Sequence, residues 1–224
     1  MEDLNNDNKF EEFELAENFL GLNTENLFSE IWIKPKKVFI YLFSTNPNKY
    51  VELLFIVGAV CSALDRSLEK YQSYFYYSIA SYIGIFILAT LITWGSYYLY
   101  VWILKFVGNG FLKGTASVSD YKTILAWSLV PAIASILPTL FMMMLYGVIA
   151  VSDSYQPETT TVSIVFIVVG VLQIILGIWS LCILVTGIKY VQKFTVWKAI
   201  LNVLIPIVAF VIIFMLLLIV SGVM

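Results

Sequence analysis

The ionisable side chains nearest to the apolar parts of the sequence are the residues best suited to chemistry. They are Glu52, Asp65, Lys105 and Lys189, and all four fall near the ends of long apolar runs. Charged groups deep within a membrane span are the usual mark of proton relays and ion pathways. No two carboxylates lie deep in one run, so no pair is placed to act as general acid and base. The sequence therefore argues against proton-coupled transport.

Other catalytic and metal chemistry is also missing from the sequence. It contains no histidine, which excludes His-ligated zinc and Ser-His or Cys-His catalysis. Cys61 and Cys182 lie in different apolar runs and cannot form a four-thiolate site. The segment VGNGFLKG, residues 107–114, lacks the GxxxxGK[ST] spacing of a phosphate loop, and we interpret it as a flexible connection. We therefore predict a chain that is not an enzyme and binds no cofactor and no metal.

The composition defines the class of protein. The chain is 60% hydrophobic and 12% charged, whereas soluble domains are about 45–50% apolar and about 25% charged. Its basic residues are too few and too dispersed for nucleic-acid binding. Five apolar runs are long enough, or nearly so, to cross about 30 Å of hydrocarbon. They cover about 50–64, 74–104, 123–150, 162–188 and 199–223. We predict an all-α polytopic membrane protein, a five-span helical bundle with an N-terminal interfacial amphipathic helix.

The lysines and arginines predict the topology of this bundle. Basic residues accumulate in cytoplasmic loops, and here they form three groups: Lys34, Lys36, Lys37 and Lys49; Lys105, Lys113 and Lys122; Lys189, Lys193 and Lys198. With five spans, all three groups lie on one side of the membrane. We expect the N-terminus in the cytoplasm and the C-terminus outside. Splitting the long second run into two spans would place the basic groups on opposite sides.

Residues 27–46 precede the first run and carry apolar side chains at helical spacing. Pro35 suits the first turn of a helix. We expect Lys34, Lys36 and Lys37 to face anionic head groups, while Trp32 and the phenylalanines enter the membrane interface. The alternative is a helix packed against the cytoplasmic end of the bundle, since both placements need the same apolar stripe.

The acidic segment 1–26 forms a cytoplasmic tail ahead of this helix, and 47–224 form the transmembrane domain. Nine of the 15 acidic residues fall in the first 30 positions, against one base, Lys9. The first residues lack the pattern of a cleaved signal peptide, so we expect the tail to remain in the mature chain. Phe10, Phe13 and Leu20 share a helical spacing that favours a short docking helix for a partner protein. A disordered acidic tail is the alternative.

Three prolines stand inside two of the apolar runs: Pro131 and Pro138 in the run 123–150, and Pro206 in the run 199–223. In lipid, a carbonyl freed by proline must be satisfied by hydroxyl groups or by a neighbouring helix. Ser128, Ser135 and Thr139 lie close enough in sequence to do so. We interpret the prolines as structural kinks, and a gate or hinge is the alternative.

Small and uncharged polar residues predict how the spans pack. Gly58 with Ser62, Ala59 with Ala63, and Gly170 with Gly177 form candidate close-approach faces. The deep polar residues Thr93, Gln173 and Ser180 are suited to hydrogen bonds between helices. Tyr97 and Tyr98 belong to an aromatic belt or, alternatively, form hydrogen bonds within the bundle.

Three segments of the sequence resemble a known family. They are LFSEIWIKPKKVFIYL at 27–42, SDYKTILAWSLVP at 119–131 and GIKYVQKFTVWKAILNVLIP at 187–206. Together they resemble the Yip-domain family of Rab-interacting integral membrane proteins, and its bacterial-type members in particular. The resemblance covers roughly 27–220. It implies that four residues match positions of the family and have a structural role: Trp32, Pro35, Pro131 and Pro206.

The resemblance implies a five-span bundle with a cytoplasmic N-terminus, here in the bacterial inner membrane. For eukaryotic members it implies a role in vesicle traffic, Rab-type GTPase partners and hetero-oligomers. The short tail of this chain lacks the longer pattern of those members, which argues against a GTPase contact. We expect membrane lipids and a protein partner, or a homo- or hetero-oligomer. The predicted function is a non-enzymatic scaffold or complex subunit that organises partner proteins or lipid at the cytoplasmic leaflet. The rival is a passive conduit for lipid or small solutes.

Overall fold

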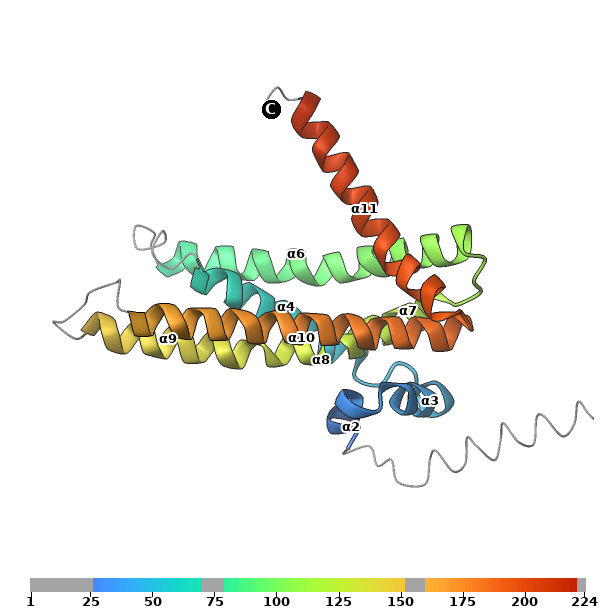
Figure 1. The fold of residues 1–224 in the computed structure, drawn as a ribbon, viewed down its shortest axis with the longest axis horizontal. Helices are drawn as coiled ribbons and strands as arrows, with labels where there is room; N and C mark the ends of the chain where they lie inside the picture. The colour runs from blue at the N-terminus through green and yellow to red at the C-terminus, as the bar shows by residue number, and fades with distance from the viewer. Residues whose placement is uncertain (1–25, 70–78, 152–159, 221–224) are drawn as a thin grey trace, which may run out of the picture. The chain divides into compact units, whose positions relative to one another are not determined.

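The computed structural model describes residues 26–69, 79–151 and 160–220, and every element in these residues is helical (Figure 1). The helices are α2 (Leu27–Ile33), α3 (Pro35–Thr45), α4 (Val51–Glu69), α6 (Ile79–Lys105), the π-helix η1 (Phe106–Phe111), α7 (Val118–Ser128), α8 (Val130–Ala134), α9 (Ile136–Val151), α10 (Thr160–Gln192) and α11 (Val196–Val220). The predicted all-α membrane fold is confirmed. The docking residues Phe10, Phe13 and Leu20 lie outside the described residues.

Four stretches of the described chain are long and apolar enough to cross a membrane: Ile83–Phe111, Val118–Met142, Ile167–Gln192 and Val196–Ile219. They correspond to the second to fifth predicted runs. The first run forms α4, a helix of 19 residues that carries Glu52 in its first turn and Arg66 in its last. Because α4 is not among the four, the predicted number of five spans stays a prediction.

The chain forms two compact units. The first unit comprises Met1–Lys49, Ile103–Ile124 and Ile183–Met224, and the second comprises Tyr50–Trp102 and Leu125–Cys182. The helices α6, α7 and α10 therefore contribute residues to both units.

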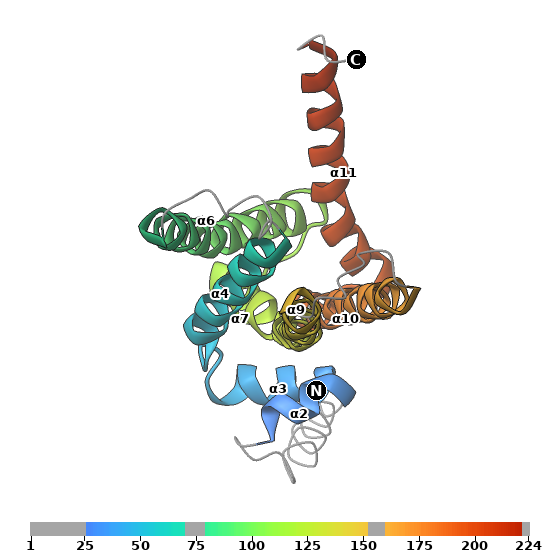
Figure 2. The same ribbon diagram turned by 90° about the vertical axis from the view of Figure 1, so that its left-hand side faces the viewer.

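The core of the first unit contains side chains from α2, α3, α7 and α10. Fully buried members include Leu27, Ile31, Phe39, Tyr121 and Ile188. The helices α2 and α3 pack against each other, and Figure 2 shows them at the start of the coloured chain. Beyond Pro206, by contrast, the large side chains of α11 are mostly exposed, as expected of a helix surrounded by lipid.

In the second unit α4 packs against α8 and α9. The predicted close-approach face of α4, which consists of small residues, is confirmed. Ala59 and Ala63 are buried, and a Cβ added at Gly58 would lie 3.2 Å from Leu129. The prediction for Gly170 and Gly177 is wrong, since nothing lies within 4 Å of a Cβ added at either position.

The prolines act in two ways. Pro131 and Pro138 lie in the first turns of α8 and α9, where a missing N–H loses no helical partner. We expected kinks at these two prolines. The structure instead has breaks between helices, at Leu129 and at Ser135. Pro206, in contrast, lies inside the continuous helix α11.

Candidate membrane-interface site

The helices α2 and α3 meet at an elbow formed by Ile33, Lys34 and Pro35. Lys34 ends one helix and begins the next, with a backbone φ of −132° and ψ of 59°. Its backbone N–H donates to the Glu30 carbonyl at 2.7 Å, and its own carbonyl accepts from Val38 at 3.2 Å. A residue before proline is disfavoured in helical conformation, which explains the break. The predicted single helix is thus two helices, and the second begins at Pro35 as expected.

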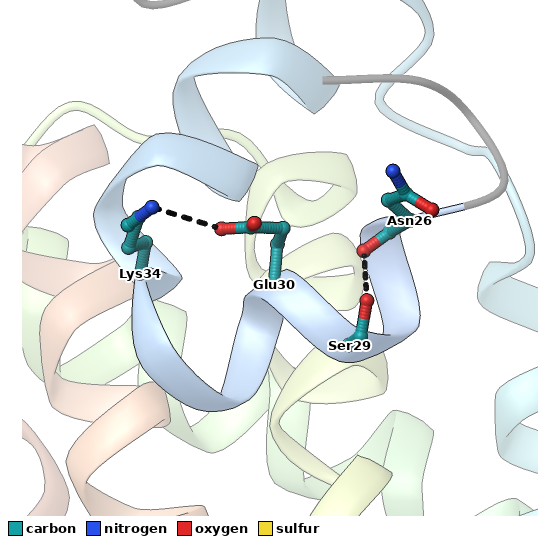
Figure 3. Close-up of polar contacts among 4 residues, drawn as sticks. All are labelled: Asn26, Ser29, Glu30 and Lys34. Atoms are coloured by element: carbon teal, nitrogen blue, oxygen red, sulfur yellow. Dashed lines mark hydrogen bonds and ion pairs between the residues drawn. The ribbon is translucent and has the colours of Figure 1, made fainter. Parts of the chain in front are cut away.

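Two polar contacts lie at the two ends of α2, Asn26 with Ser29 at its start and Glu30 with Lys34 at its end (Figure 3). The Ser29 hydroxyl donates to the Asn26 carbonyl at 2.9 Å. The Lys34 ammonium lies 3.7 Å from the Glu30 carboxylate, one helical turn away. An exposed ion pair of this spacing contributes only about 0.3–0.5 kcal/mol. It offsets the charge of Lys34 only in part and leaves its exposed ammonium group able to contact an anion.

A depression of about 370 Å³ opens at the elbow, and its lining residues are Ile33, Lys34, Pro35, Lys36, Lys37 and Ile40. Lys34 and Lys36 are exposed, while Lys37 and Pro35 are half-buried. The first turn of α3 contains no acidic residue, and its N-cap makes no side-chain hydrogen bond. Since the N-terminal end of a helix carries partial positive charge, lysines there add to that charge instead of balancing it.

The apolar face of α2 and α3 is covered by the protein itself. Phe39, which we expected in the membrane interface, is fully buried, because its ring lies against Gly187 of α10, where an added Cβ would come within 2.9 Å. The Phe43 ring lies 6.0 Å from that of Tyr190. Packing against the bundle thus accounts for the apolar stripe, while Trp32 is half-buried.

The linker after α3 is tied to the start of α7. The Thr123 hydroxyl donates to the Pro47 carbonyl at 2.7 Å, and the Ser119 hydroxyl donates to Asn48 Oδ1 at 3.0 Å. These contacts fix α3 at the level where two candidate spans, Val118–Met142 and Ile167–Gln192, begin and end. The C-terminal end of α3 and the linker therefore lie beside the boundary of the apolar spans, and the elbow lies at the opposite end of α3.

A cluster of neutral polar side chains lies in the same unit, and sequence reasoning missed it. The amide cluster consists of Asn109, Tyr121, Gln192 and Asn202, from η1, α7, α10 and α11. Gln192 Nε2 donates to Asn109 Oδ1 at 2.8 Å and to the Tyr121 hydroxyl at 2.7 Å. Asn202 Nδ2 donates to the same hydroxyl at 2.8 Å. The four residues join four candidate spans at one end.

Gln192 also fixes the loop that follows η1. Its Oε1 accepts from the backbone N–H of Thr115 at 2.6 Å and of Ala116 at 3.1 Å. The Gln192 side chain thereby makes the four hydrogen bonds that one amide group offers. The two predicted basic loops, around Lys113 and Lys193, are thus brought together.

The glycine-rich segment 107–114, which we expected to be a flexible connection, is an ordered part of this cluster. Gly108 lies in η1, and an added Cβ would stand 2.0 Å from the Tyr121 hydroxyl. At Gly114 it would stand 2.1 Å from Gln192 Oε1. Only glycine allows this close approach. The spacing of these glycines alone does not identify their partners, because the partners are far apart along the chain.

The serines near the prolines bind carbonyls close to the two breaks. Ser128 donates to the Leu125 carbonyl at 2.7 Å and Ser135 to the Ala132 carbonyl at 2.6 Å. The Ser180 hydroxyl of α10 donates to the Ser128 carbonyl. Hydroxyl groups from the same helix and from a neighbour therefore support the breaks.

The second unit contains a polar chain that links α4, α9 and α10. The carboxylate chain consists of Asp65, Thr139 and Gln173: the Thr139 hydroxyl donates to Asp65 Oδ1 at 2.8 Å, and Gln173 Nε2 donates to the Thr139 hydroxyl oxygen at 2.9 Å. The expected hydrogen bond of Gln173 between helices is confirmed. Tyr98 donates to Glu52, and Tyr97 lies 3.4 Å from the Ser62 hydroxyl, so both tyrosines bond within the bundle.

Comparison with known proteins identifies the family. No curated protein and no solved structure gives a significant match to the chain. The family model of the Yip1 domain matches residues 29–218, which include the elbow, the amide cluster and the carboxylate chain. The chain therefore belongs to the Yip1-domain family of membrane proteins.

Proposed function

We propose that this integral membrane protein is a non-enzymatic scaffold or complex subunit that organises partner proteins or lipid at the cytoplasmic leaflet. The observation that carries the proposal is the fixed α2–α3 segment. Its apolar face is buried against α10, while Lys34, Lys36 and Ile33 stay exposed. A segment held in this way presents a fixed basic surface beside the ends of the spans.

The orientation of this surface follows from the basic residues. Lysines of the α3–α4 linker, of the loop after η1 and of the α10–α11 turn belong to one unit. The preference of such residues for the cytoplasm supports an N-terminus inside and, with five spans, a C-terminus outside. The resemblance of the sequence to bacterial-type members supports a bacterial inner membrane. Family membership supports a role in a complex, because the eukaryotic proteins that the sequence resembles form hetero-oligomers.

The decisive experiment is purification of the full chain in a gentle detergent, followed by mass spectrometry of co-purifying proteins. We expect a partner at a fixed ratio to the chain. Deletion of residues 2–24 removes Phe10, Phe13 and Leu20, and is expected to release that partner while α2–α11 remain folded. A chain that purifies alone, from native membranes and at every detergent concentration, would contradict the role as a subunit of a protein complex.

A passive conduit is the second candidate, and the carboxylate chain favours it. Asp65, Thr139 and Gln173 place polar groups from three helices in contact within the second unit. Solute efflux from vesicles that contain the purified chain tests this directly. The scaffold proposal predicts the same efflux as from empty vesicles, whereas efflux that falls in Thr139→Val would support the conduit.

A further inference from the structure

We propose that the depression at the α2–α3 elbow binds the phosphate-bearing head group of an anionic phospholipid. The inference rests on the proposed function, because it assumes that the elbow faces the lipid head groups, and it names the ligand of that surface. The binding groups are the ammonium groups of Lys34, Lys36 and Lys37.

The charge at the elbow is unbalanced. Between Asn26 and Lys49 the sequence contains one acidic residue, Glu30, against four lysines. Glu30 lies 3.7 Å from Lys34. Within the described residues, no ion pair engages Lys36 or Lys37. Two ammonium groups thus line a concave surface without an ion-pair partner among residues 26–69, 79–151 and 160–220, which favours an anion.

The position of the elbow decides which anion this is. Phe39 against Gly187 and Thr123 bonded to Pro47 hold α3 at the ends of two candidate spans. Head groups of the bilayer lie at that level. A phosphate attached to lipid is therefore always present beside the depression, at a far higher local concentration than a free phosphate ion.

The apolar rim distinguishes a lipid from a soluble anion. Ile33 is 76% exposed although the depression beside it is basic. A free phosphate ion gains no binding energy from contact with Ile33. The glycerol and upper acyl carbons of a lipid, in contrast, would cover the Ile33 side chain and remove it from water. Basic and apolar groups side by side are typical of segments that lie in the membrane interface.

The test is an equilibrium titration of fluorescent phosphatidylglycerol into the detergent-purified full chain, with phosphatidylcholine as the neutral lipid. We expect phosphatidylglycerol to bind more tightly. The variant with Lys34→Gln, Lys36→Gln and Lys37→Gln should raise its dissociation constant about 100-fold, since each lysine near the surface contributes about a fivefold factor. The matched control carries Lys113→Gln, Lys189→Gln and Lys193→Gln, and so removes the same charge from exposed positions. It should change the dissociation constant for phosphatidylglycerol less than about threefold.

Two further arms identify the source of the phosphate. Ile33→Ser should weaken phosphatidylglycerol binding several-fold, and inorganic phosphate at millimolar concentration should not displace the lipid. Displacement by inorganic phosphate with no effect of Ile33→Ser would show a site for the free ion and overturn the proposal. Melting temperatures of all variants close to that of the unaltered chain show that the fold is intact.

Other outcomes are equally decisive. Equal weakening by the two triple variants would mean that net charge, not the depression, attracts lipid. If the elbow variant keeps its lipid affinity but loses a co-purifying protein, the lysines serve an acidic protein, and the scaffold role stands without the lipid site. Lipid binding at the elbow in a chain that never co-purifies with a partner would instead overturn the complex-subunit role alone.

Discussion

The amide cluster of the first unit consists of neutral side chains, whereas the polar chain of the second unit ends in a carboxylate. In the amide cluster, Tyr121, Gln192 and Asn202 are at most 6% exposed. In the carboxylate chain, Asp65, Thr139 and Gln173 are each half-buried. Neutral amides cost less to bury than a charge, provided that each is hydrogen-bonded. The first arrangement is suited to joining helices, and the second leaves an ionisable group within reach of solvent.

The two arrangements also differ in how completely their groups are paired. Gln192 makes four hydrogen bonds to three other segments of the chain. Among the described residues, Gln173 forms one such bond, to Thr139. One atom of the amide cluster departs from this pattern: Asn202 Oδ1 is buried and has no partner within the described residues. The comparison predicts that stability is concentrated in the amide cluster.

The largest effect is expected from Gly108→Ala. The added Cβ would stand 2.0 Å from the hydroxyl of Tyr121, which is fully buried and held by hydrogen bonds from Gln192 and Asn202. Overpacking costs about 1–3 kcal/mol and occasionally more. For so close an approach we expect a loss of about 3–4 kcal/mol, so the melting temperature in detergent should fall by roughly 10 °C.

The matched control is Gly110→Ala in the same π-helix, where nothing lies within 4 Å of the added Cβ. It should leave the melting temperature unchanged or raise it slightly, because alanine has less freedom in the unfolded chain. Equal melting temperatures for the two variants would show that η1 does not pack on Tyr121.

The second prediction compares the two glutamines directly. Gln192→Leu should lower the free energy of unfolding by about 3 kcal/mol. The change leaves buried donors and acceptors without a partner, and each such group costs about 1–3 kcal/mol. Gln173→Leu should cost only about 0.6 kcal/mol, the average for a hydrogen bond between membrane helices. Chemical denaturation in mixed micelles measures both. A larger loss for Gln173→Leu would reverse the comparison and make the second unit the more constrained one.

The third prediction concerns the tyrosine hydroxyls. The Tyr121 hydroxyl accepts from Gln192 and Asn202, whereas that of Tyr97 has a long contact of 3.4 Å with Ser62. Tyr121→Phe should therefore cost about 1–2 kcal/mol of unfolding free energy and Tyr97→Phe about 0.5 kcal/mol or less. Thermal unfolding followed by circular dichroism distinguishes these values. No difference between them would mean that water replaces the lost bonds at Tyr121.

Sequence patterns predicted the spans because hydrophobicity alone decides which segments enter lipid. The runs 123–150 and 199–223 correspond to Val118–Met142 and Val196–Ile219. Pro35 likewise predicted the start of α3, because its ring fixes a local backbone angle. These features depend on neighbours in the sequence.

The amide cluster depends instead on partners far apart in the chain. Tyr121 is 71 positions from Gln192 and 81 from Asn202. In the sequence, Asn109 and Gln192 stand near the ends of apolar runs, where polar residues usually mark loops. The α2–α3 stripe was ambiguous for a related reason, since lipid and a neighbouring helix select the same apolar side chains. One signal was available: glycines beside Asn109 and polar amides at the ends of three runs predict close packing when considered together.

The smallest predicted effect tests the turn that follows Gln192. Lys193 has a φ of 52°, in the left-handed region that disfavours side chains, and Phe194 closes the turn by donating to the Lys189 carbonyl at 3.1 Å. Glycine removes the steric cost of about 1–2 kcal/mol but adds freedom to the unfolded chain. Lys193→Gly should therefore raise the unfolding free energy by about 0.5–1 kcal/mol, which is measured as a small rise in melting temperature.

The control is Lys189→Gly, which removes the same charge inside α10 and should lower the unfolding free energy by about 1 kcal/mol. Opposite signs for two lysine-to-glycine changes four residues apart would show that the turn itself, and not its charge, positions Gln192 in the amide cluster. If both variants lose stability, the left-handed turn is absent, and Gln192 is held by its hydrogen bonds alone.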